Sequence, residues 1–194
     1  MRLSEEFQIL IVLGKSGSGK GTQVELLQRK FGFQVVSSGN LLRTRMVQDD
    51  FVGERIRELI GKGILVPTPI IFHLWLHRFE ELREQENLKG IIFEGSPRKV
   101  YEAKLLDEVL PFYQLEGNVR VLYINVSDQE ATKRLLERAR SDDDKQAIQE
   151  RLRWYQEEVV PVIDYYREKG LLIEVNGEKS VEAINEEIVG KLRL

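Results

Sequence analysis

Residues 14–20 are the part of the chain whose residue types most directly predict chemistry. They read GKSGSGK and fit the pattern G-x-x-x-x-G-K, with Gly21-Thr22 where Ser or Thr usually follows. Glycines let successive backbone N–H groups turn inward around anionic oxygens, and Lys20 adds a formal charge directed at terminal phosphates. A flexible turn that happens to contain lysine is the simpler alternative. We predict that this loop binds the phosphates of a donor nucleotide through Ser16, Gly17, Ser18, Gly19, Lys20, Gly21 and Thr22.

The segments on either side of the loop favour phosphate binding over a flexible turn. The apolar, β-branched run from Phe7 to Leu13 predicts a buried strand, and apolar residues recur at helical spacing from Gly21 onward. A helix that begins there directs its positive end at a bound anion. Further strands are predicted at residues 33–36, 91–93, 119–126 and 171–175, with helices between them. This alternation predicts an α/β protein with a three-layer α/β/α P-loop NTPase fold and a parallel sheet of about five strands.

Two helix boundaries are predicted from proline. Thr68 and Pro69 suit the N-cap and first turn of a helix that continues through Phe79. A long polar helical region from about Gln129 to Glu168 is expected to break near Ser141 and again near Pro161. We expect Trp75 and Phe79 to lie in the core.

Composition and charge exclude several classes of partner. The 194 residues are 42 % apolar and 31 % charged, which is typical of one globular domain, and the net charge of −3 gives no general attraction to nucleic acid or membranes. The absence of cysteine excludes disulfides and thiolate metal sites. No apolar run approaches the roughly 20 residues of a membrane span, and the acidic N-terminus is unlike a signal peptide. We therefore expect a cytoplasmic monomer.

Several segments beyond the loop resemble one family in the order in which they occur. They are Gly21-Thr22-Gln23, the segment SSGNLLR at residues 37–43, GILVP at 63–67, EGSPR at 94–98, RSDD at 140–143, ERL at 150–152, residues 161–166, and VNGEK at 175–179. Together they span nearly the whole chain and resemble the adenylate kinase family. The resemblance implies a nucleoside monophosphate kinase, an enzyme that reversibly transfers the γ-phosphoryl group of ATP to a monophosphate acceptor.

The arginines suit this chemistry because two anionic phosphate chains must be brought together and the transferring group must be held in line. An arginine fork binds phosphate oxygens two at a time. The simpler alternative is that these are surface arginines paired with neighbouring acids. The resemblance implies acceptor binding by Ser38, Gly39, Arg43, Val66, Gly95, Arg98 and Glu102. It implies contact with the transferring group by Lys20, Arg98, Arg138, Arg140 and Arg151, and donor binding by Arg134, which would stack on the base, and by Lys179.

The resemblance also implies a magnesium ion rather than a side-chain nucleophile. Mg²⁺ would be held by the donor phosphates and water, with no direct protein ligand. Glu94, at the end of a predicted strand, is the carboxylate expected near that water shell. The alternative is a structural acid that accepts bonds from nearby backbone N–H groups.

Four positions depart from the pattern of the family. Asn40 and Glu94 each replace an aspartate, Ser96 replaces a phenylalanine, and Glu102 stands where adenylate kinases usually have glutamine. A carboxylate only accepts hydrogen bonds, and guanine offers two donors along the edge that would face it. We take AMP as the acceptor. GMP, UMP, CMP or a deoxynucleotide remain alternatives, as does a nucleotide-binding module with weak catalysis.

The chain is predicted to form a single nucleoside monophosphate kinase domain over residues 1–194. An acceptor-binding insertion is expected at about residues 37–72, and a minimal lid at about 138–143 resembles the short-lid class that includes uridylate–cytidylate kinases. His73 and His77 are four residues apart but lack the further ligands of a zinc site, so we expect a surface helix. The acidic run at residues 142–144 is expected to be a polar turn before a helix.

Overall fold

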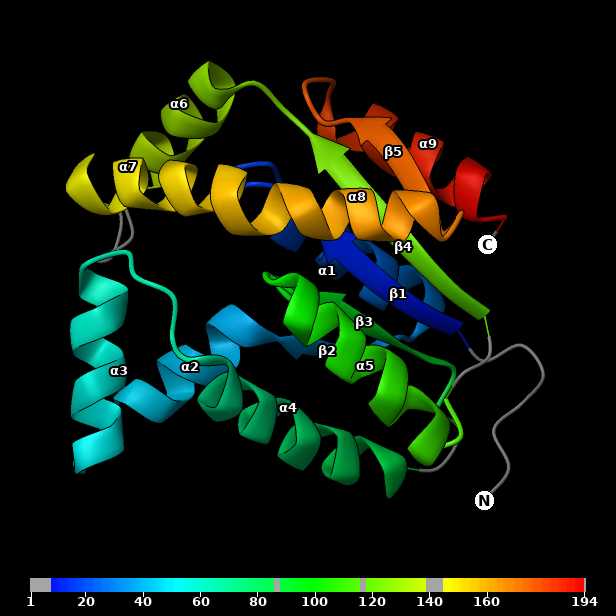
Figure 1. The fold of residues 1–194 in the computed structure, drawn as a ribbon. Helices are drawn as coiled ribbons and strands as arrows, with labels where there is room; N and C mark the ends of the chain where they lie inside the picture. The colour runs from blue at the N-terminus through cyan, green and yellow to red at the C-terminus, as the bar shows by residue number, and fades with distance from the viewer. Residues whose placement is uncertain (1–7, 86–87, 116–117, 139–144, 194) are drawn as a thin grey trace.

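A five-stranded parallel sheet forms the centre of the computed structural model, which describes residues 8–85, 88–115, 118–138 and 145–193 (Figure 1). The strands lie side by side in the order β2-β3-β1-β4-β5. Their bounds are β1 Gln8–Leu13, β2 Gln34–Ser37, β3 Gly90–Glu94, β4 Asn118–Asn125 and β5 Leu172–Asn176. The predicted α/β fold, and the five strands expected from the sequence, are confirmed.

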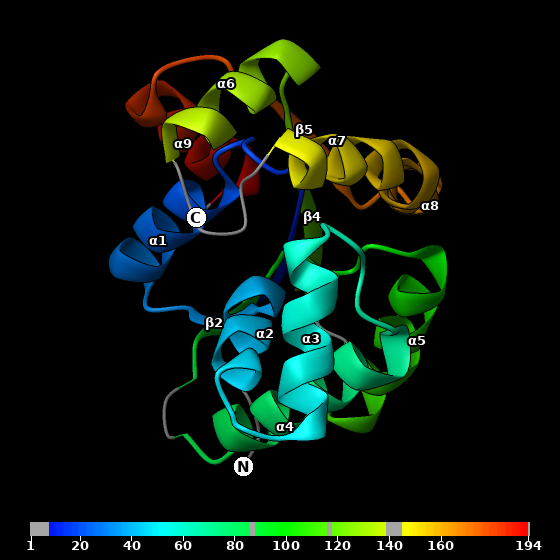
Figure 2. The ribbon, with the colours of Figure 1, turned by 90° about the vertical axis from the view of Figure 1, so that its left-hand side faces the viewer.

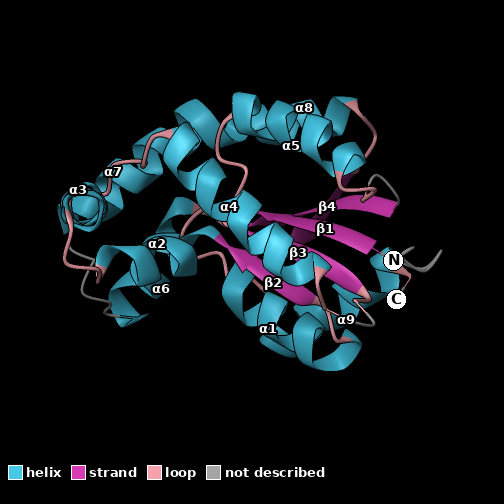
Figure 3. Ribbon diagram, turned by 90° about the horizontal axis from the view of Figure 1, so that it is seen from below, coloured by secondary structure: helices cyan, strands magenta, loops and turns pink. Residues whose placement is uncertain are grey.

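Helices connect these strands and cover both faces of the sheet (Figure 3). In chain order they are α1 Lys20–Phe31, α2 Ser38–Met46, α3 Phe51–Gly61, α4 Thr68–Arg83, α5 Val100–Phe112, α6 Asp128–Arg138, α7 Lys145–Trp154, the π-helical turn η1 Tyr155–Val159, α8 Val160–Glu168 and α9 Val181–Leu192. None of the described helices is both long and apolar enough to cross a membrane.

The alternation of side chains along β1 explains the three layers. Ile9 and Ile11 pack in a core cluster with residues of α4, α5 and α8, whereas Leu10 and Val12 pack with residues of α1 and α9. Successive residues of a strand point to opposite faces, so a strand that is apolar throughout must be covered on both sides. Figure 3 shows α1 and α9 on one side of the sheet and α4, α5 and α8 on the other. Trp75 and Phe79 are fully buried in the first cluster, as expected.

The connection from β2 to β3 is longer than a single crossover helix. It contains α2, α3 and α4. Figures 1 and 2 show α3 beyond the end of the sheet rather than on one of its faces. This connection includes residues 37–72, where the acceptor-binding insertion is expected.

The structure confirms that Pro69 lies in the first turn of a helix and that the α-helix is interrupted near Pro161, but it corrects the details of both boundaries. Pro67 is the N-cap of α4, and Thr68 is its first residue, with the hydroxyl donating to Oε1 of Glu102 at 3.1 Å instead of capping the helix. The partner is a buried carboxylate far away in sequence, which local pattern cannot reveal. The chain also stays helical through Pro161, because the π-helical turn η1 precedes it and Pro161 falls in the first turn of α8. The break expected near Ser141 lies outside the described residues.

Candidate active site

The loop between β1 and α1 has the backbone conformation of a phosphate-binding loop. Gly17 and Gly19 have φ angles of 83° and 88°, in the left-handed region that favours glycine, and α1 begins directly after Gly19. A Cβ atom at Gly17 would come within 2.4 Å of the Ala131 carbonyl oxygen on α6, so no larger residue fits there. The loop thus passes close to α6, and the backbone N–H groups at the start of α1 are of the kind that can bind an anion.

Lys20 is held by the loop that it follows. Its Nζ donates to the carbonyl oxygens of Gly14 and Lys15, each at 2.7 Å. Burial lowers the pKa of Lys20 to about 8, with Glu94 opposing the shift and Arg98 and Arg138 adding to it. Partial loss of water and the like charges of Arg98 and Arg138 both disfavour the charged ammonium group. The negative charges of a bound polyphosphate would neutralise these cations.

This pKa predicts that nucleotide binding takes up a proton in weakly alkaline solution. The native pKa of about 8 lies below the ordinary 10.5, so between these pH values the native protein binds fewer protons than the unfolded chain, and the free energy of unfolding rises with pH. Phosphate anions favour charged Lys20 and raise its pKa again. At pH 8.5 we expect ATP binding to be accompanied by net proton uptake, measured by titration calorimetry in two buffers of different ionisation enthalpy. Equal apparent enthalpies in the two buffers would contradict this assignment.

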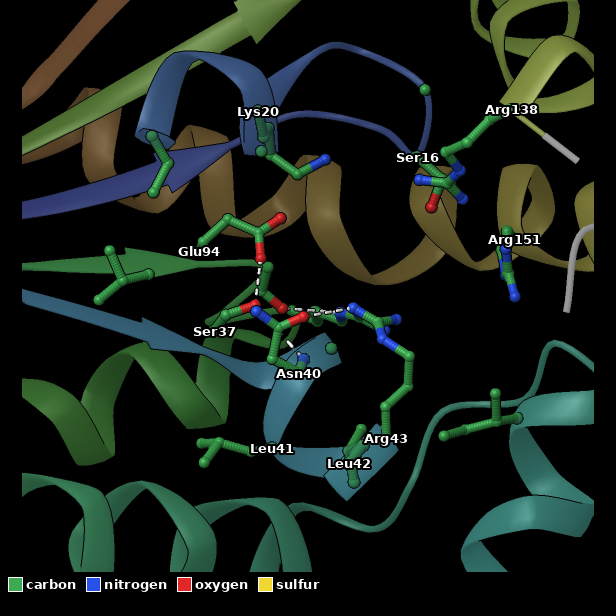
Figure 4. Close-up of a pocket in the computed structure, with 18 of the residues that line it drawn as sticks. Ser16, Lys20, Ser37, Asn40, Leu41, Leu42, Arg43, Glu94, Arg138 and Arg151 are labelled. Carbon is green, nitrogen blue, oxygen red and sulfur yellow. Dashed lines mark hydrogen bonds between the residues drawn. The ribbon is translucent and has the colours of Figure 1, made fainter. Parts of the chain in front are cut away.

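Glu94 lies at the carboxyl end of β3, opposite Ser37 at the end of β2 in the parallel register. The Ser37 hydroxyl donates to Oε2 of Glu94 at 2.5 Å. Figure 4 shows the carboxylate between Ser37 and the ammonium group of Lys20, at the wall of the cavity. The Glu94 carboxylate therefore accepts a hydrogen bond from a neighbouring hydroxyl. It lies between the phosphate-binding loop, residues 14–20, and the start of α2.

Arg98 follows β3 and is held on three sides. Its Nε donates to the Gly95 carbonyl oxygen at 2.8 Å, and its guanidinium carbon lies 5.1 Å from the centroid of the Trp154 ring. Its backbone N–H donates to Oε2 of Glu102 at 2.7 Å. Burial lowers the pKa of the Arg98 guanidinium, with Glu102 and Glu94 opposing the shift. The side chain is thus a preorganised cation at the end of the strand.

Arg43 and Asn40 lie one turn apart on α2. Arg43 donates to Oδ1 of Asn40 at 2.7 Å. Ser37 caps the helix by accepting from the backbone N–H of Asn40 at 3.4 Å. Asn40 stands where the family has aspartate, and its amide oxygen still orients the arginine without placing a charge beside it. Figure 4 shows the Arg43 side chain extending from α2 into the cavity, with its guanidinium turned toward Asn40.

One cavity of about 940 Å³ brings the predicted donor and acceptor residues together. Seven basic side chains and two carboxylates, Glu25 and Glu94, line it. The basic residues are Lys20, Arg43, Arg78, Arg98, Arg134, Arg138 and Arg151. The excess of positive charge suits a ligand with several phosphate groups. The cavity is also lined by other residues that were predicted to bind phosphate or acceptor: Ser16, Gly17, Gly19, Gly21, Thr22, Gly39 and Gly95.

Arg134 lies on the donor side of the cavity. Its Nε donates to Glu130 at 2.7 Å, and its Nη1 donates to the Gly177 carbonyl oxygen at 3.0 Å. The second bond joins α6 to the turn after β5, which carries the segment expected to hold the donor base. Lys179, predicted on the same side, pairs with Glu187 at 2.8 Å and does not line the cavity.

Other predicted residues lie behind the cavity wall or outside the described residues. Ser18, Ser38, Val66 and Glu102 are buried and do not line the cavity. Arg140 and the predicted lid beyond Arg138 lie outside the described residues. His77 is exposed and lies 3.3 Å from Glu81, and no group of three or more metal-binding side chains occurs within the described part of the chain.

Comparison with known proteins identifies the family. The family model for adenylate kinase matches residues 12–171. The chain belongs to the adenylate kinase family. The adenylate kinase of Azobacteroides pseudotrichonymphae is 36 % identical over 186 residues, or 93 % of this chain and 95 % of that protein. Adenylate kinase 1 of Nostoc sp. is 35 % identical over 184 residues, covering 94 % and 97 % of the two chains. As a member of the adenylate kinase family, the chain is a phosphotransferase of the nucleoside monophosphate kinase type.

This adenylate kinase family member has two site features that the sequence analysis missed. Trp154 lines the cavity beneath Arg98, and its indole Nε1 donates to the Gly63 carbonyl oxygen at 2.8 Å. Ser96 contacts the Ser38 hydroxyl, which also accepts from Nε1 of Trp75 at 2.9 Å. The replacement of phenylalanine by Ser96 was visible in the sequence, but its partner on α2 was not. Nothing in the sequence pattern distinguished Trp154 from an ordinary core residue.

Proposed function

We propose that this protein catalyses the reversible transfer of the γ-phosphoryl group of ATP to AMP. The observation that supports this most strongly is the shared cavity, which has the phosphate-binding loop and Lys20 on one side and Arg43 and Arg98 on the other. A protein that held only ATP would have no need of a second cationic site after β3. Two such sites in one cavity suit two phosphate chains meeting end to end.

In the proposed reaction a phosphate oxygen of AMP attacks the γ-phosphorus of ATP. The bond from that phosphorus to the β–γ bridging oxygen breaks, so both products are ADP and no side chain takes a proton. The loop N–H groups and Lys20 would hold the donor phosphates, and Arg43 and Arg98 would hold the acceptor phosphate. Arg138 and Arg151, with Arg140 from the predicted lid, would neutralise charge on the transferring group.

The residues present fit a magnesium ion held by phosphate and water. A single carboxylate, Glu94, lies between the loop and Ser37, and the described residues contain no cluster of acids that would hold a metal by themselves. Mg²⁺ usually keeps several waters and binds through one or two carboxylates plus substrate phosphates. Glu94 would then accept hydrogen bonds from water molecules bound to the ion. The positive charge of the ion would neutralise part of the negative charge of the donor phosphates.

The acceptor base is the finer part of the proposal, and Glu102 is the residue that tests it. Glu102 is buried, and its two oxygens accept from the Thr68 hydroxyl and the Arg98 backbone N–H. These two bonds explain the carboxylate without any contact to a base, which supports AMP over the guanine alternative. Glutamine fits the same place, because its carbonyl can accept from Arg98 and its NH₂ group can donate to the Thr68 hydroxyl.

A coupled assay of ADP formation across AMP, GMP, UMP, CMP and their deoxy forms tests the proposal. We expect the highest kcat/KM with AMP, and we expect Glu102→Gln to change the AMP-to-GMP ratio less than about threefold, because a group that contacts no base has little effect on selectivity. Equal or better turnover of GMP, reversed by Glu102→Gln, would establish the guanine alternative. Tight ATP binding without transfer to any monophosphate would instead indicate a binding module.

The proposal includes a cytoplasmic monomer with a minimal lid at about residues 138–143 and an acceptor-binding insertion at about residues 37–72. The absence of cysteine supports a reducing compartment. The several helices between β2 and β3 support the insertion. Sedimentation equilibrium of the purified protein tests the monomer, and a dimer at micromolar concentration would contradict it.

A further inference from the structure

Trp154 connects two parts of the molecule that are far apart in sequence. It is the last residue of α7, the helix that also carries Arg151, and it is 8 % exposed. Its Nε1 donates to the carbonyl oxygen of Gly63, in the loop between α3 and α4, and the ring lies against the Arg98 guanidinium. One side chain therefore contacts the expected acceptor-binding insertion and the cation expected to hold the acceptor phosphate.

Gly63 is fitted closely against α7. Its φ angle is 69°, and a Cβ atom there would come within 2.7 Å of the Ala147 carbonyl oxygen. Ala147 lies in the first turn of α7 and Trp154 is its last residue, so the backbone of the helix and a side chain from its end both contact Gly63. Figure 1 shows this loop passing below α7. The Trp154 hydrogen bond thus joins the loop to α7 at a place where the backbones already approach closely.

The ring of Trp154 also determines the surroundings of Arg98. The distance of 5.1 Å between the guanidinium carbon and the ring centroid is within the range of a cation–π contact. The guanidinium carbon lies over the ring, and Nε of Arg98 donates to the Gly95 carbonyl oxygen, so both contacts restrict where the guanidinium can lie. Arg98 is half-buried, so this contact replaces part of the water that the cation has lost.

We propose that Trp154 is a positioning residue for the acceptor nucleotide. It fixes the Gly63 loop to α7 and holds the Arg98 guanidinium over its ring, so that the acceptor insertion, Arg98 and Arg151 are placed relative to one another. The proposal rests on the proposed function, because it assigns the acceptor monophosphate to Arg98. Neither the hydrogen bond to Gly63 nor the ring contact to Arg98 involves a residue of the phosphate-binding loop, so we expect ATP affinity to change less than AMP affinity when these contacts are lost.

Two substitutions separate the two contacts. Trp154→Phe keeps an aromatic ring against Arg98 and removes the N–H donor, whereas Trp154→Leu removes both. For Trp154→Phe we expect the Kd for AMP, measured by titration calorimetry, to rise roughly fivefold to tenfold, which corresponds to the loss of one buried hydrogen bond. The Kd for ATP is expected to stay within about twofold of the wild-type value. For Trp154→Leu we expect the same effect on AMP affinity or a larger one, and a lower kcat as well.

The matched control is Tyr165→Phe on α8. It removes a hydrogen bond from an aromatic side chain, to Asp107, at a position that does not line the cavity. We expect it to leave both dissociation constants unchanged. If Trp154→Phe raised both dissociation constants equally, or neither, the positioning role would be wrong.

A measurement on the wild-type sequence does not depend on the stability of the variants. The chain has two tryptophans, so protein labelled with 5-fluorotryptophan gives two fluorine resonances, assigned with whichever of Trp154→Phe and Trp75→Phe folds. We expect AMP to shift the Trp154 resonance, and an unchanged Trp154 resonance would overturn the proposal. If the wild-type protein binds AMP and ATP but forms no ADP, the proposed function fails, while these binding data still decide the role of Trp154.

Discussion

Replacing Arg98 with lysine is expected to lower kcat/KM by roughly 10²- to 10³-fold while the charge is kept. Preorganised donors on transferring phosphoryl groups contribute effects of this size. Arg98 combines a bond from Nε to Gly95 with a ring contact to Trp154, and both hold the planar fork in one orientation. A lysine ammonium is a point charge on a flexible chain and cannot bind two oxygens in a fixed plane. Steady-state kinetics with ATP and AMP as varied substrates measure the loss.

Arg153→Lys is the matched control for Arg98→Lys. Arg153 is an exposed residue of α7 whose guanidinium bonds Glu150 and Glu157 on the same helical surface. Exposed ion pairs of this kind contribute roughly 0.2–1 kcal/mol to stability, so kcat/KM is expected to change less than about twofold. If Arg98→Lys retained kcat/KM within tenfold of the wild-type value, the proposal that Arg98 holds the acceptor phosphate would be wrong.

Replacing Lys20 with methionine is expected to reduce kcat by about 10³-fold or more. Lys20 supplies the formal charge nearest the loop N–H groups, and its Nζ is already directed by Gly14 and Lys15. A charge that is already held in position stabilises the charge that develops on the phosphates without reorganisation during the reaction. Methionine has a similar length and no charge, so the change tests electrostatics rather than the filling of space.

Stability measurements separate this loss of activity from unfolding. Burial lowers the pKa of Lys20 to about 8, so its charge opposes folding at neutral pH, and removing it is expected to leave the thermal midpoint unchanged or higher. Lys30→Met, at an exposed position of the same helix, is the control and is expected to keep full activity. A Lys20→Met enzyme with more than a tenth of the wild-type kcat would contradict the catalytic role of Lys20.

The fold was predictable because its signals are local. The strand β1 is apolar at every position from Ile9 to Leu13, which is typical of a strand that is covered on both faces. The glycine at position 14, directly after this run, indicates where the strand ends and the loop begins. The two helix boundaries predicted from proline were right in position, but Thr68 is not the N-cap of α4, and the chain stays helical through Pro161. The Thr68 hydroxyl bonds Glu102, which is 34 residues away and which local pattern could not reveal.

By itself, the sequence determined the phosphate-binding loop, the five parallel strands and the presence of arginines at the ends of strands and on helices. These follow from backbone freedom and from the period of apolar residues, both of which are written in neighbouring positions. Only the tertiary structure decided that Arg43, Arg98 and Arg151 line the cavity of Lys20, that Glu102 supports Arg98 and Thr68, and that Trp154 joins α7 to Gly63. Such contacts depend on three-dimensional distances between segments that are remote in sequence, and no local periodicity encodes those distances.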